Sequence, residues 1–197
     1  MYNHPGLGNK MIRFICNEIK TTQDAALFLK FNAGEMNYMK LIKLMYLADR
    51  EALSRWERPL TGDSYFSMKN GPILSNVLDW ISHGEPPNEK LFWCQHISNP
   101  SRYNVWLKKD PGQSELSKRE IELIKEIDEK YKKFNQWDMV DICHEILPEW
   151  ESPGTTAIPI QIEDILKAMR KTDREIALIE EDIANLEYRD FLLSTGS

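Results

Sequence analysis

The chain has 197 residues, 42% of them hydrophobic and 28% charged, a composition typical of an ordinary water-soluble protein. This length suits one domain with an appendage. The formal net charge of −6 and the pI of about 5.3 disfavour the broad basic surface that binds nucleic acid, so we expect no nucleic-acid partner.

Three features predict a cytoplasmic protein without a membrane segment. No apolar run reaches the roughly 18–20 residues that span a bilayer. The segment Met1–Gly8 lacks the basic and apolar regions of a secretion signal. The three cysteines, Cys16, Cys94 and Cys143, are too few and too scattered for a disulfide framework, which favours reduced thiols.

Apolar residues at helical spacing predict three helices at the start of the chain. The first covers residues 11–19 and the second covers residues 22–33, with Gly34 as its C-terminal glycine. Asn37 is expected to cap the third helix, whose apolar side chains between residues 41 and 56 form a wide stripe. This third helix is expected to be central to the core.

The pattern then changes to that of short strands. Residues 64–68 are aromatic and bounded by turn residues, which predicts a strand. Pro72 is expected at the first position of a helix that runs to Ile81. Residues 91–97 and 103–109 are predicted as further strands, so the chain should contain a small antiparallel sheet of about three strands.

Two more helices are expected before the chain changes in character. Ser117 and Glu120 form the capping-box pattern at the start of a helix that extends to Phe134. Another helix is predicted over residues 138–147, and residues 151–158 resemble a linker.

The C-terminal segment carries an apolar heptad pattern of nearly four repeats. Its a and d positions are Ile162, Ile165, Met169, Thr172, Ile176, Ile179, Ile183 and Leu186. This pattern predicts a long helix over residues 159–193. Its narrow apolar stripe requires a cover, which can be its own domain, a second copy in a homo-oligomer, or a partner protein.

Together these elements predict a mainly α fold with a small antiparallel sheet (α+β). We expect a helical domain with a three-stranded sheet over residues 1–150, a linker over residues 151–158, and a long heptad-patterned C-terminal helix over residues 159–193.

Cysteine and histidine do not occur at the spacings of a metal site, so neither a metal nor another cofactor is expected. Cys94 and His96 could share a strand face, but two ligands do not hold an ion. In a helix, Cys143 and His144 point about 100° apart and cannot pair with each other. Contact of Cys143 with His83 or with His96 stays open, although a buried structural thiol is the favoured interpretation.

No enzymatic activity is predicted. The sequence lacks GxxxxGK[ST], GxGxxG and GxSxG, so phosphate-binding loops and a hydrolase nucleophile have no support. Five carboxylates could include an acid–base pair, but structural roles in ion pairs and turns are favoured for them. They are Asp49, Glu51, Asp63, Glu145 and Glu149.

Surface residues able to contact a partner are expected among the tryptophans, in a turn and on the C-terminal helix. Six tryptophans are many for this length, and most should belong to the core, but Trp106 and Trp150 are expected at the surface. Lys69 and Asn70 lie in a turn and should also be exposed. The full set of predicted partner-binding residues is Asp63, Tyr65, Lys69, Asn70, Trp106, Trp150, Ile176, Ile179, Ile183 and Leu186.

The middle of the chain resembles a known family. The run from Lys40 to Asp49, then Thr61–Asp63 and Met68–Ile73, and later Cys143-His144 and Pro148–Trp150 are similar to the Panacea domain, the SocA-like antitoxin domain that also occurs in phage-associated proteins. The resemblance covers residues 10–150 and implies a mostly helical domain with a small sheet. The matching positions are Lys40, Leu44, Tyr46, Asp49, Gly62, Asp63, Met68, Gly71, Pro72 and His144.

The resemblance implies an antitoxin that neutralises its cognate toxin by direct protein–protein binding, including in phage defence. Small alarmone-synthetase-like toxins are among the partners that it suggests. One alternative is an adaptor that delivers the toxin to a protease. Another is an enzyme that modifies the toxin or reverses its damage. The heptad pattern after Pro159 lies outside the matching part, so its role rests on periodicity alone.

Overall fold

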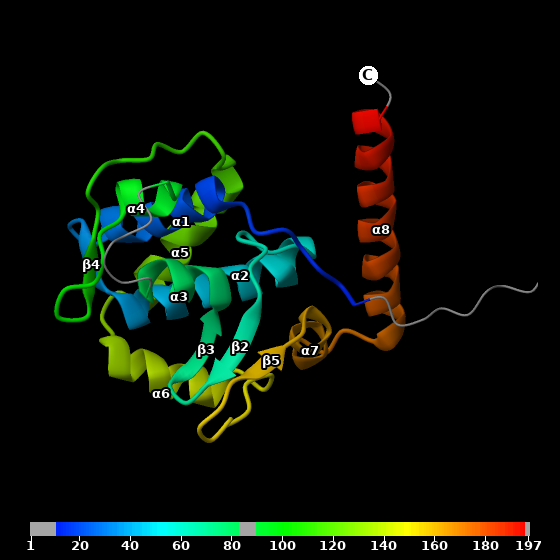
Figure 1. Cartoon of the computed structure of the whole chain (residues 1–197). Coiled ribbons are helices and arrows are strands. Elements are labelled where there is room, and N and C mark those ends of the chain that lie inside the picture. The colour runs from blue at the N-terminus through cyan, green and yellow to red at the C-terminus, as the bar shows by residue number, and fades with distance from the viewer. Residues whose placement is uncertain (1–10, 83–89, 196–197) are drawn as a thin grey trace, which may run out of the picture. The chain divides into compact units, whose positions relative to one another are not determined.

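The computed structural model describes residues 11–82 and 90–195, with side chains of the last helix described as far as Leu186 and at Arg189. Within these residues, eight helices and two small antiparallel sheets confirm the mainly helical fold class (Figure 1). The helices are α1 Glu18–Phe31, α2 Tyr38–Trp56, α3 Ser75–Ser82, α4 Phe92–His96, α5 Lys118–Tyr131, α6 Gln136–Ile146, α7 Ile162–Ala168 and α8 Asp173–Thr195. The strands are β1 Glu35–Asn37, β2 Tyr65–Met68, β3 Gly71–Leu74, β4 Asn104–Trp106 and β5 Ile158–Ile160.

The chain divides into two compact units. The main unit is residues 14–160, and the terminal unit combines residues 1–13 with residues 161–197. The expected division into residues 1–150, a linker and a C-terminal helix stays a prediction. In the described part of both units, no helix is long and apolar enough to cross a membrane.

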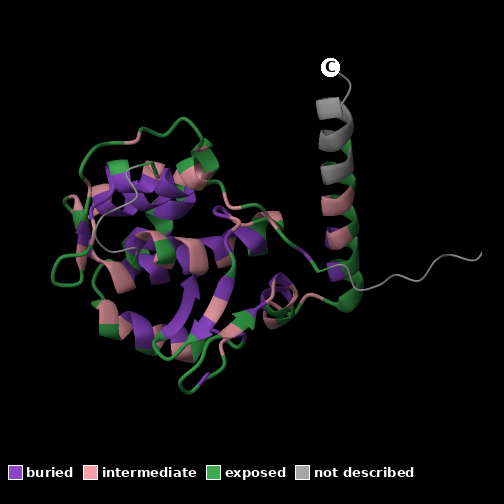
Figure 2. Cartoon of the chain, viewed as in Figure 1, coloured by how far each residue is buried: buried purple, intermediate pink, exposed green. Residues whose placement is uncertain are grey.

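The predicted central helix is confirmed as α2. It packs against α1, α5, α6 and β3, and Figure 2 shows buried residues concentrated along it and in α1, β2 and β3. Asn37 caps it as predicted, because its side-chain oxygen accepts a hydrogen bond from the Met39 amide at 3.0 Å. The helix ends at Trp56, where Glu57 has a left-handed φ of 59°.

The predicted helix over residues 11–19 is wrong. Residues 11–17 have no regular structure, and one helix, α1, replaces the two that were expected. The reason is local: the Asn17 side chain accepts a hydrogen bond from the Lys20 amide at 3.1 Å and starts the helix at Glu18. Ile15, counted as part of an apolar stripe, is 94% exposed.

The strand predicted over residues 64–68 is confirmed as β2. It lies in the middle of the sheet β3-β2-β5, in which Ser67 pairs with Pro72 and Tyr65 pairs with Ile160. Pro72 therefore belongs to edge strand β3 and does not begin a helix, as the sequence had predicted. Helix α3 starts at Ser75 because the Asp63 carboxylate accepts hydrogen bonds from the Asn76 amide at 3.0 Å and the Val77 amide at 3.1 Å.

The strand predicted over residues 91–97 is also wrong. These residues contain the short helix α4, whose Trp93 amide donates to the Glu18 carboxylate of α1 at 3.1 Å. A continuous apolar run of this length has no alternation that separates a strand from a helix. The strand predicted over residues 103–109 is confirmed in part as β4, but it pairs with β1 in a separate two-stranded sheet.

The starts of α5 and α6 follow from their caps. Ser117 and Glu120 form the predicted capping box, with the Ser117 amide 2.7 Å from the Glu120 carboxylate. Helix α6 begins two residues before the predicted Asp138 because Asn135 accepts hydrogen bonds from the Trp137 and Asp138 amides.

In the terminal unit the heptad pattern does contain a long helix, but the single helix predicted over residues 159–193 is wrong. Helix α7 ends before Arg170, which has a left-handed φ of 65°. Thr172 then caps α8, because its hydroxyl and its amide both bind the Glu175 carboxylate. A polar residue at a d position of the heptad is thus the start of a new helix.

Buried hydrogen bonds to Asp49 join α2 to the segment that leads into β2. Its carboxylate accepts hydrogen bonds from the Leu60 amide and the Thr61 amide, each at 2.9 Å. The Thr61 hydroxyl and the Tyr65 hydroxyl donate to the second oxygen. Since Asp49 is buried, these donors replace the water that the carboxylate loses on folding.

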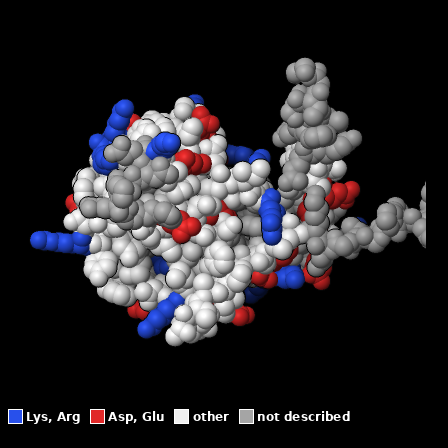
Figure 3. All heavy atoms as spheres, viewed as in Figure 1, with Lys and Arg blue, Asp and Glu red and all other residues white. Residues whose placement is uncertain are grey.

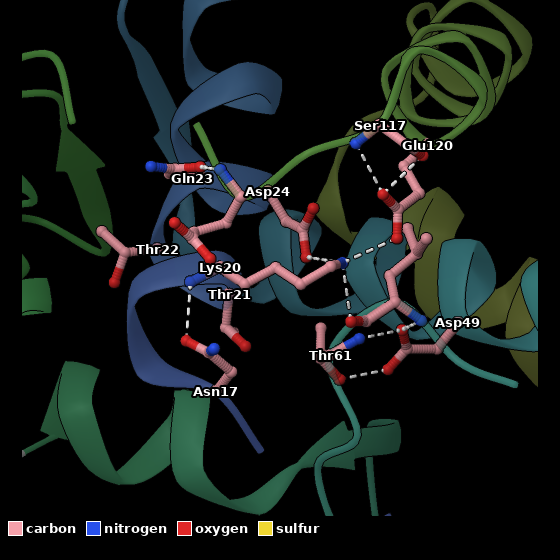
Figure 4. Close-up of polar contacts among 12 residues, drawn as sticks. Asn17, Lys20, Thr21, Thr22, Gln23, Asp24, Asp49, Thr61, Ser117 and Glu120 are labelled. Carbon is pink, nitrogen blue, oxygen red and sulfur yellow. Dashed lines mark hydrogen bonds and ion pairs between the residues drawn. The ribbon is translucent and has the colours of Figure 1, made fainter. Parts of the chain in front are cut away.

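Lys20 connects α1 to the same region (Figure 4). Its ammonium donates to the Leu60 carbonyl at 2.8 Å and lies 3.1 Å from the Glu120 carboxylate of α5. The carboxylate of Asp24, one turn further along α1, is 3.7 Å from this ammonium. Among the described residues, neither Asp24 oxygen has a hydrogen-bond partner, and burial raises the pKa of Asp24 to about 8.

We expect Asp49→Ala to destabilise the main unit by about 3 kcal/mol or more. The substitution leaves two backbone amides and the Tyr65 hydroxyl buried without their acceptor, and each such group costs about 1–3 kcal/mol. Urea unfolding followed by tryptophan fluorescence measures it, because all six tryptophans lie in residues 14–160. The control Glu51→Ala removes an exposed ion pair with Arg55 and should cost at most about 0.5 kcal/mol. Equal effects of the two variants would contradict the role of Asp49.

We expect stability to fall as the pH rises from about 4 to 8, partly because of Asp24. The raised pKa means that the folded state holds a proton that the unfolded state has already released in this range. Asp24→Asn should therefore reduce the fall of the unfolding free energy with pH by up to about 1.4 kcal/mol per pH unit. The gain in stability of this variant over the wild type should be largest near pH 8. Urea titrations at several pH values measure the slope. The exposed control Glu122→Gln should leave the slope unchanged, and an unchanged slope in Asp24→Asn would refute the expectation.

Candidate functional site

The turn between β2 and β3 presents two polar side chains to solvent. Lys69 and Asn70 occupy it and are both exposed, as predicted from the sequence. Gly71 follows with a φ of +94°, and a Cβ there would lie 3.1 Å from Lys43 Cε and 3.5 Å from Cys143 Cβ. The hairpin thus packs its backbone closely on α2 and α6, which only glycine permits.

Trp150 and His144 lie beside this turn. The Trp150 indole donates to the Met68 carbonyl at 3.1 Å, and its ring stacks on the His144 imidazole with 3.8 Å between centroids. His144 also makes a hydrogen bond with the Lys69 backbone. These contacts bring together one continuous group, which we name the hairpin surface: Met68, Lys69, Asn70, His144 and Trp150.

The charge of the hairpin surface is modest. Burial lowers the pKa of His144, and the nearby Lys43 ammonium lowers it further, so the imidazole is neutral at pH 7. Lys69 contributes a positive charge at the exposed turn. A half-buried indole beside polar and cationic groups is a combination common at protein–protein contacts.

Polar side chains of α2 bind the two segments that carry the hairpin surface. The Lys43 ammonium donates to the Pro72 carbonyl at 2.7 Å, and burial lowers the pKa of Lys43 to about 8. The Glu149 carboxylate, next to Trp150, accepts hydrogen bonds from the Tyr46 hydroxyl at 3.1 Å and from Arg50 Nε at 2.7 Å. Both the hairpin and the Trp150 segment are therefore fixed to the central helix.

Burial raises the pKa of all three thiols, Cys16, Cys94 and Cys143. Cys143 is buried, and its burial raises the pKa to about 11, so the thiolate is scarce at pH 7. Cys94 and His96 do not share a strand face, because they lie on α4 about 200° apart. His83 lies outside the described residues, as does the segment Met1–Gly8. Within the described ranges, no three Cys, His, Asp or Glu side chains are grouped to hold a metal ion.

Four of the five carboxylates considered for acid–base chemistry have structural contacts: Glu51 pairs with Arg55 at the surface, and three others bind neighbouring segments. Asp49 and Glu149 are buried and bonded to donors of neighbouring segments, and Asp63 holds the start of α3. Asp49 accepts hydrogen bonds from backbone amides, and its neighbour Arg50 forms an ion pair with Glu149. These contacts favour the structural interpretation of all three carboxylates.

The ten predicted partner-binding residues do not lie in one place. Lys69, Asn70 and Trp150 belong to the hairpin surface, and Trp106 on β4 is 41% exposed. Asp63 and Tyr65 are buried, and their polar atoms bond within the main unit, so a partner has no access to them. The pattern of a short strand in the sequence does not reveal which of its sides is covered.

The four predicted residues on α8 differ in exposure along the helix. Ile176 and Ile179 are buried, with Ile179 only 4% exposed. Ile183 is half-buried and Leu186 is 40% exposed. The apolar stripe is therefore covered at its start and open further along.

Three exposed aromatic residues in the described part of the chain were not predicted as candidates: Tyr103, Phe134 and Trp137. Tyr103 is 70% exposed in a turn in which Arg102 and Tyr103 have left-handed φ values of 50° and 68°. Trp137 is 56% exposed in the first turn of α6. A helix that starts after the Asn135 cap places Trp137 on the side of α6 away from Met139 and Cys143. The exposure of Trp137 could therefore have been predicted from the sequence.

The visible face of the main unit has no extended patch of one charge. Figure 3 shows Lys and Arg scattered among Asp and Glu, with uncharged residues between them. On this face, recognition would depend on local groups such as the hairpin surface and less on a broad electrostatic field.

Comparisons with known proteins identify a family. The family described as antitoxin SocA-like, Panacea domain, matches residues 41–151, a range that contains the whole hairpin surface and ends before α7 and α8. The search of curated proteins found no match, and the search of solved structures found none either. Because the match covers more than half of the chain, this protein belongs to the SocA-like antitoxin family that is defined by the Panacea domain.

Proposed function

We propose that the protein is an antitoxin that neutralises its cognate toxin in the cytoplasm by direct protein–protein binding, without catalysis. The observation that carries this proposal is the family match over residues 41–151, which indicates an antitoxin role and a toxin partner in general. Direct binding is supported by the hairpin surface, where exposed polar groups and an indole rest on a fixed backbone. The three free cysteines are consistent with a reducing compartment.

The decisive experiment is co-expression with the gene adjacent to its own, followed by co-purification and titration of the partner's toxic activity. We expect a stable complex and inhibition that saturates near one protein per toxin, because a blocking protein acts stoichiometrically. Rescue at far lower ratios would point instead to an enzyme. Rescue that requires a cellular protease would point to an adaptor. Failure to bind any adjacent toxin, or a small alarmone-synthetase-like toxin, would overturn the proposal.

The hairpin surface is expected to contribute to toxin affinity. Lys69→Ala/Asn70→Ala removes two exposed side chains while leaving Gly71 and the strand pairing in place, so we expect binding at least about 10-fold weaker with unchanged stability. Calorimetric titration of the purified toxin measures the dissociation constant. The matched control Lys125→Ala/Glu129→Ala removes an exposed pair on α5 and should change affinity by less than about 3-fold. If both double variants bind the toxin like the wild type, the toxin binds at another surface of the protein.

A further inference from the structure

Among the described residues, the apolar stripe of helix α8 is buried only at its start. The stripe consists of Ile176, Ile179, Ile183 and Leu186, which lie within about 80° of one another around the helix. Helix α7, which contacts α8, has 7 residues, or about 10 Å, whereas α8 has 23 residues, or about 34 Å. Ile176 and Ile179 near the start of α8 are buried, whereas Leu186 is exposed.

Acidic residues border the stripe on both sides. Glu175 and Asp182 lie along one edge, and Glu180 lies along the other. Between Asp173 and Leu186 there are five acidic residues and one basic residue, Arg174, which lies on the opposite face together with the exposed Leu178. The helix therefore presents an apolar surface between two negative edges.

This charge pattern disfavours a second copy as the cover. In a parallel coiled coil, the g position Glu175 would face the e position Glu180 of the other copy. In an antiparallel pair, g positions face g positions and e positions face e positions. The e positions Asp173, Glu180 and Glu187 are all acidic, whereas the g positions include Arg189 beside Glu175 and Asp182. The parallel arrangement therefore places Glu175 opposite Glu180, and the antiparallel arrangement places acidic e positions opposite one another, which opposes association.

From these observations we propose that α8 beyond Ile179 is a docking helix for the toxin, and that it lies in an apolar groove of the toxin rimmed by lysine and arginine. The inference rests on the proposed function and adds the chemistry of the partner. Apolar contact by Ile183 and Leu186 provides affinity, and the acidic edges select a basic rim. Helix α8 lies outside the residues that match the family, whereas the hairpin surface lies inside them.

The test compares toxin binding by full-length variants, each checked for helicity by circular dichroism. Ile183→Asp/Leu186→Asp should weaken binding at least about 100-fold, because it places charges on the stripe. Leu178→Asp changes a more exposed apolar residue on the opposite face and should have less than about a 3-fold effect. Glu180→Lys/Asp182→Lys should weaken binding and reduce its salt dependence, whereas Glu181→Lys on the opposite face should not.

The outcomes separate this inference from the proposed function. If the wild type and the stripe variant bind the toxin equally, the docking helix is refuted while the antitoxin function stands. If the wild type binds no toxin, both are refuted. Sedimentation of the free protein gives the remaining answer: a wild-type dimer that becomes a monomer in Ile183→Asp/Leu186→Asp would show that a second copy covers the stripe and would overturn the inference.

Discussion

The arrangement of the main unit depends most on the buried carboxylate of Asp49. It lies on the central helix α2 and accepts hydrogen bonds from the Leu60 and Thr61 amides and from the Tyr65 hydroxyl. These contacts turn the chain after α2 and lead it into β2. Burying a carboxylate is unfavourable unless donors surround it, so the full set of contacts forms together with the fold. Packing of α1 against the same region adds the bonds of Lys20 to Leu60 and Glu120.

The central helix also determines the shape of the hairpin surface. Lys43, Tyr46 and Arg50 are spaced by three and four residues and therefore lie on one side of α2. Lys43 binds the β3 backbone at Pro72, while Tyr46 and Arg50 bind Glu149 next to Trp150. The residues that join the core to the hairpin thus also set the position of its exposed side chains. A surface fixed in this way loses little conformational entropy on binding.

The two proposed contact regions differ in physical character. The hairpin surface is polar with one stacked aromatic pair, and it lies within the residues that match the antitoxin family. The α8 stripe is apolar with acidic edges, and it lies outside those residues. Substitutions on the exposed part of α8 do not touch the buried polar contacts of α2. If both regions bind the toxin, the terminal unit can therefore change its specificity without loss of the main fold.

Local signals in the sequence determined much of the secondary structure. Asn37 at the start of α2, the Ser117 and Glu120 capping box and the strand at Tyr65–Met68 depend on neighbouring residues alone, and all three were predicted. At three other helices the capping residue sets the start in place of the apolar periodicity on which the prediction rested. Asn17 starts α1, Asn135 starts α6, and Thr172 with Glu175 starts α8. Apolar spacing describes a face, whereas a cap decides where the helix begins.

Tertiary contacts decided the rest. Asp63 is a turn residue in the sequence, but only the approach of α3 makes it a cap, and this approach leaves Pro72 in a strand. Tyr65 can lie in the core because its hydroxyl donates a hydrogen bond to Asp49, 16 residues earlier in the chain. His144 and Trp150 meet the hairpin because α6 packs against β3. The sequence by itself therefore determined the helical class, several caps and the family resemblance. The burial of polar residues and the grouping of the hairpin surface required partners distant in the chain, because a buried charge or hydroxyl is stable only where such partners bind it.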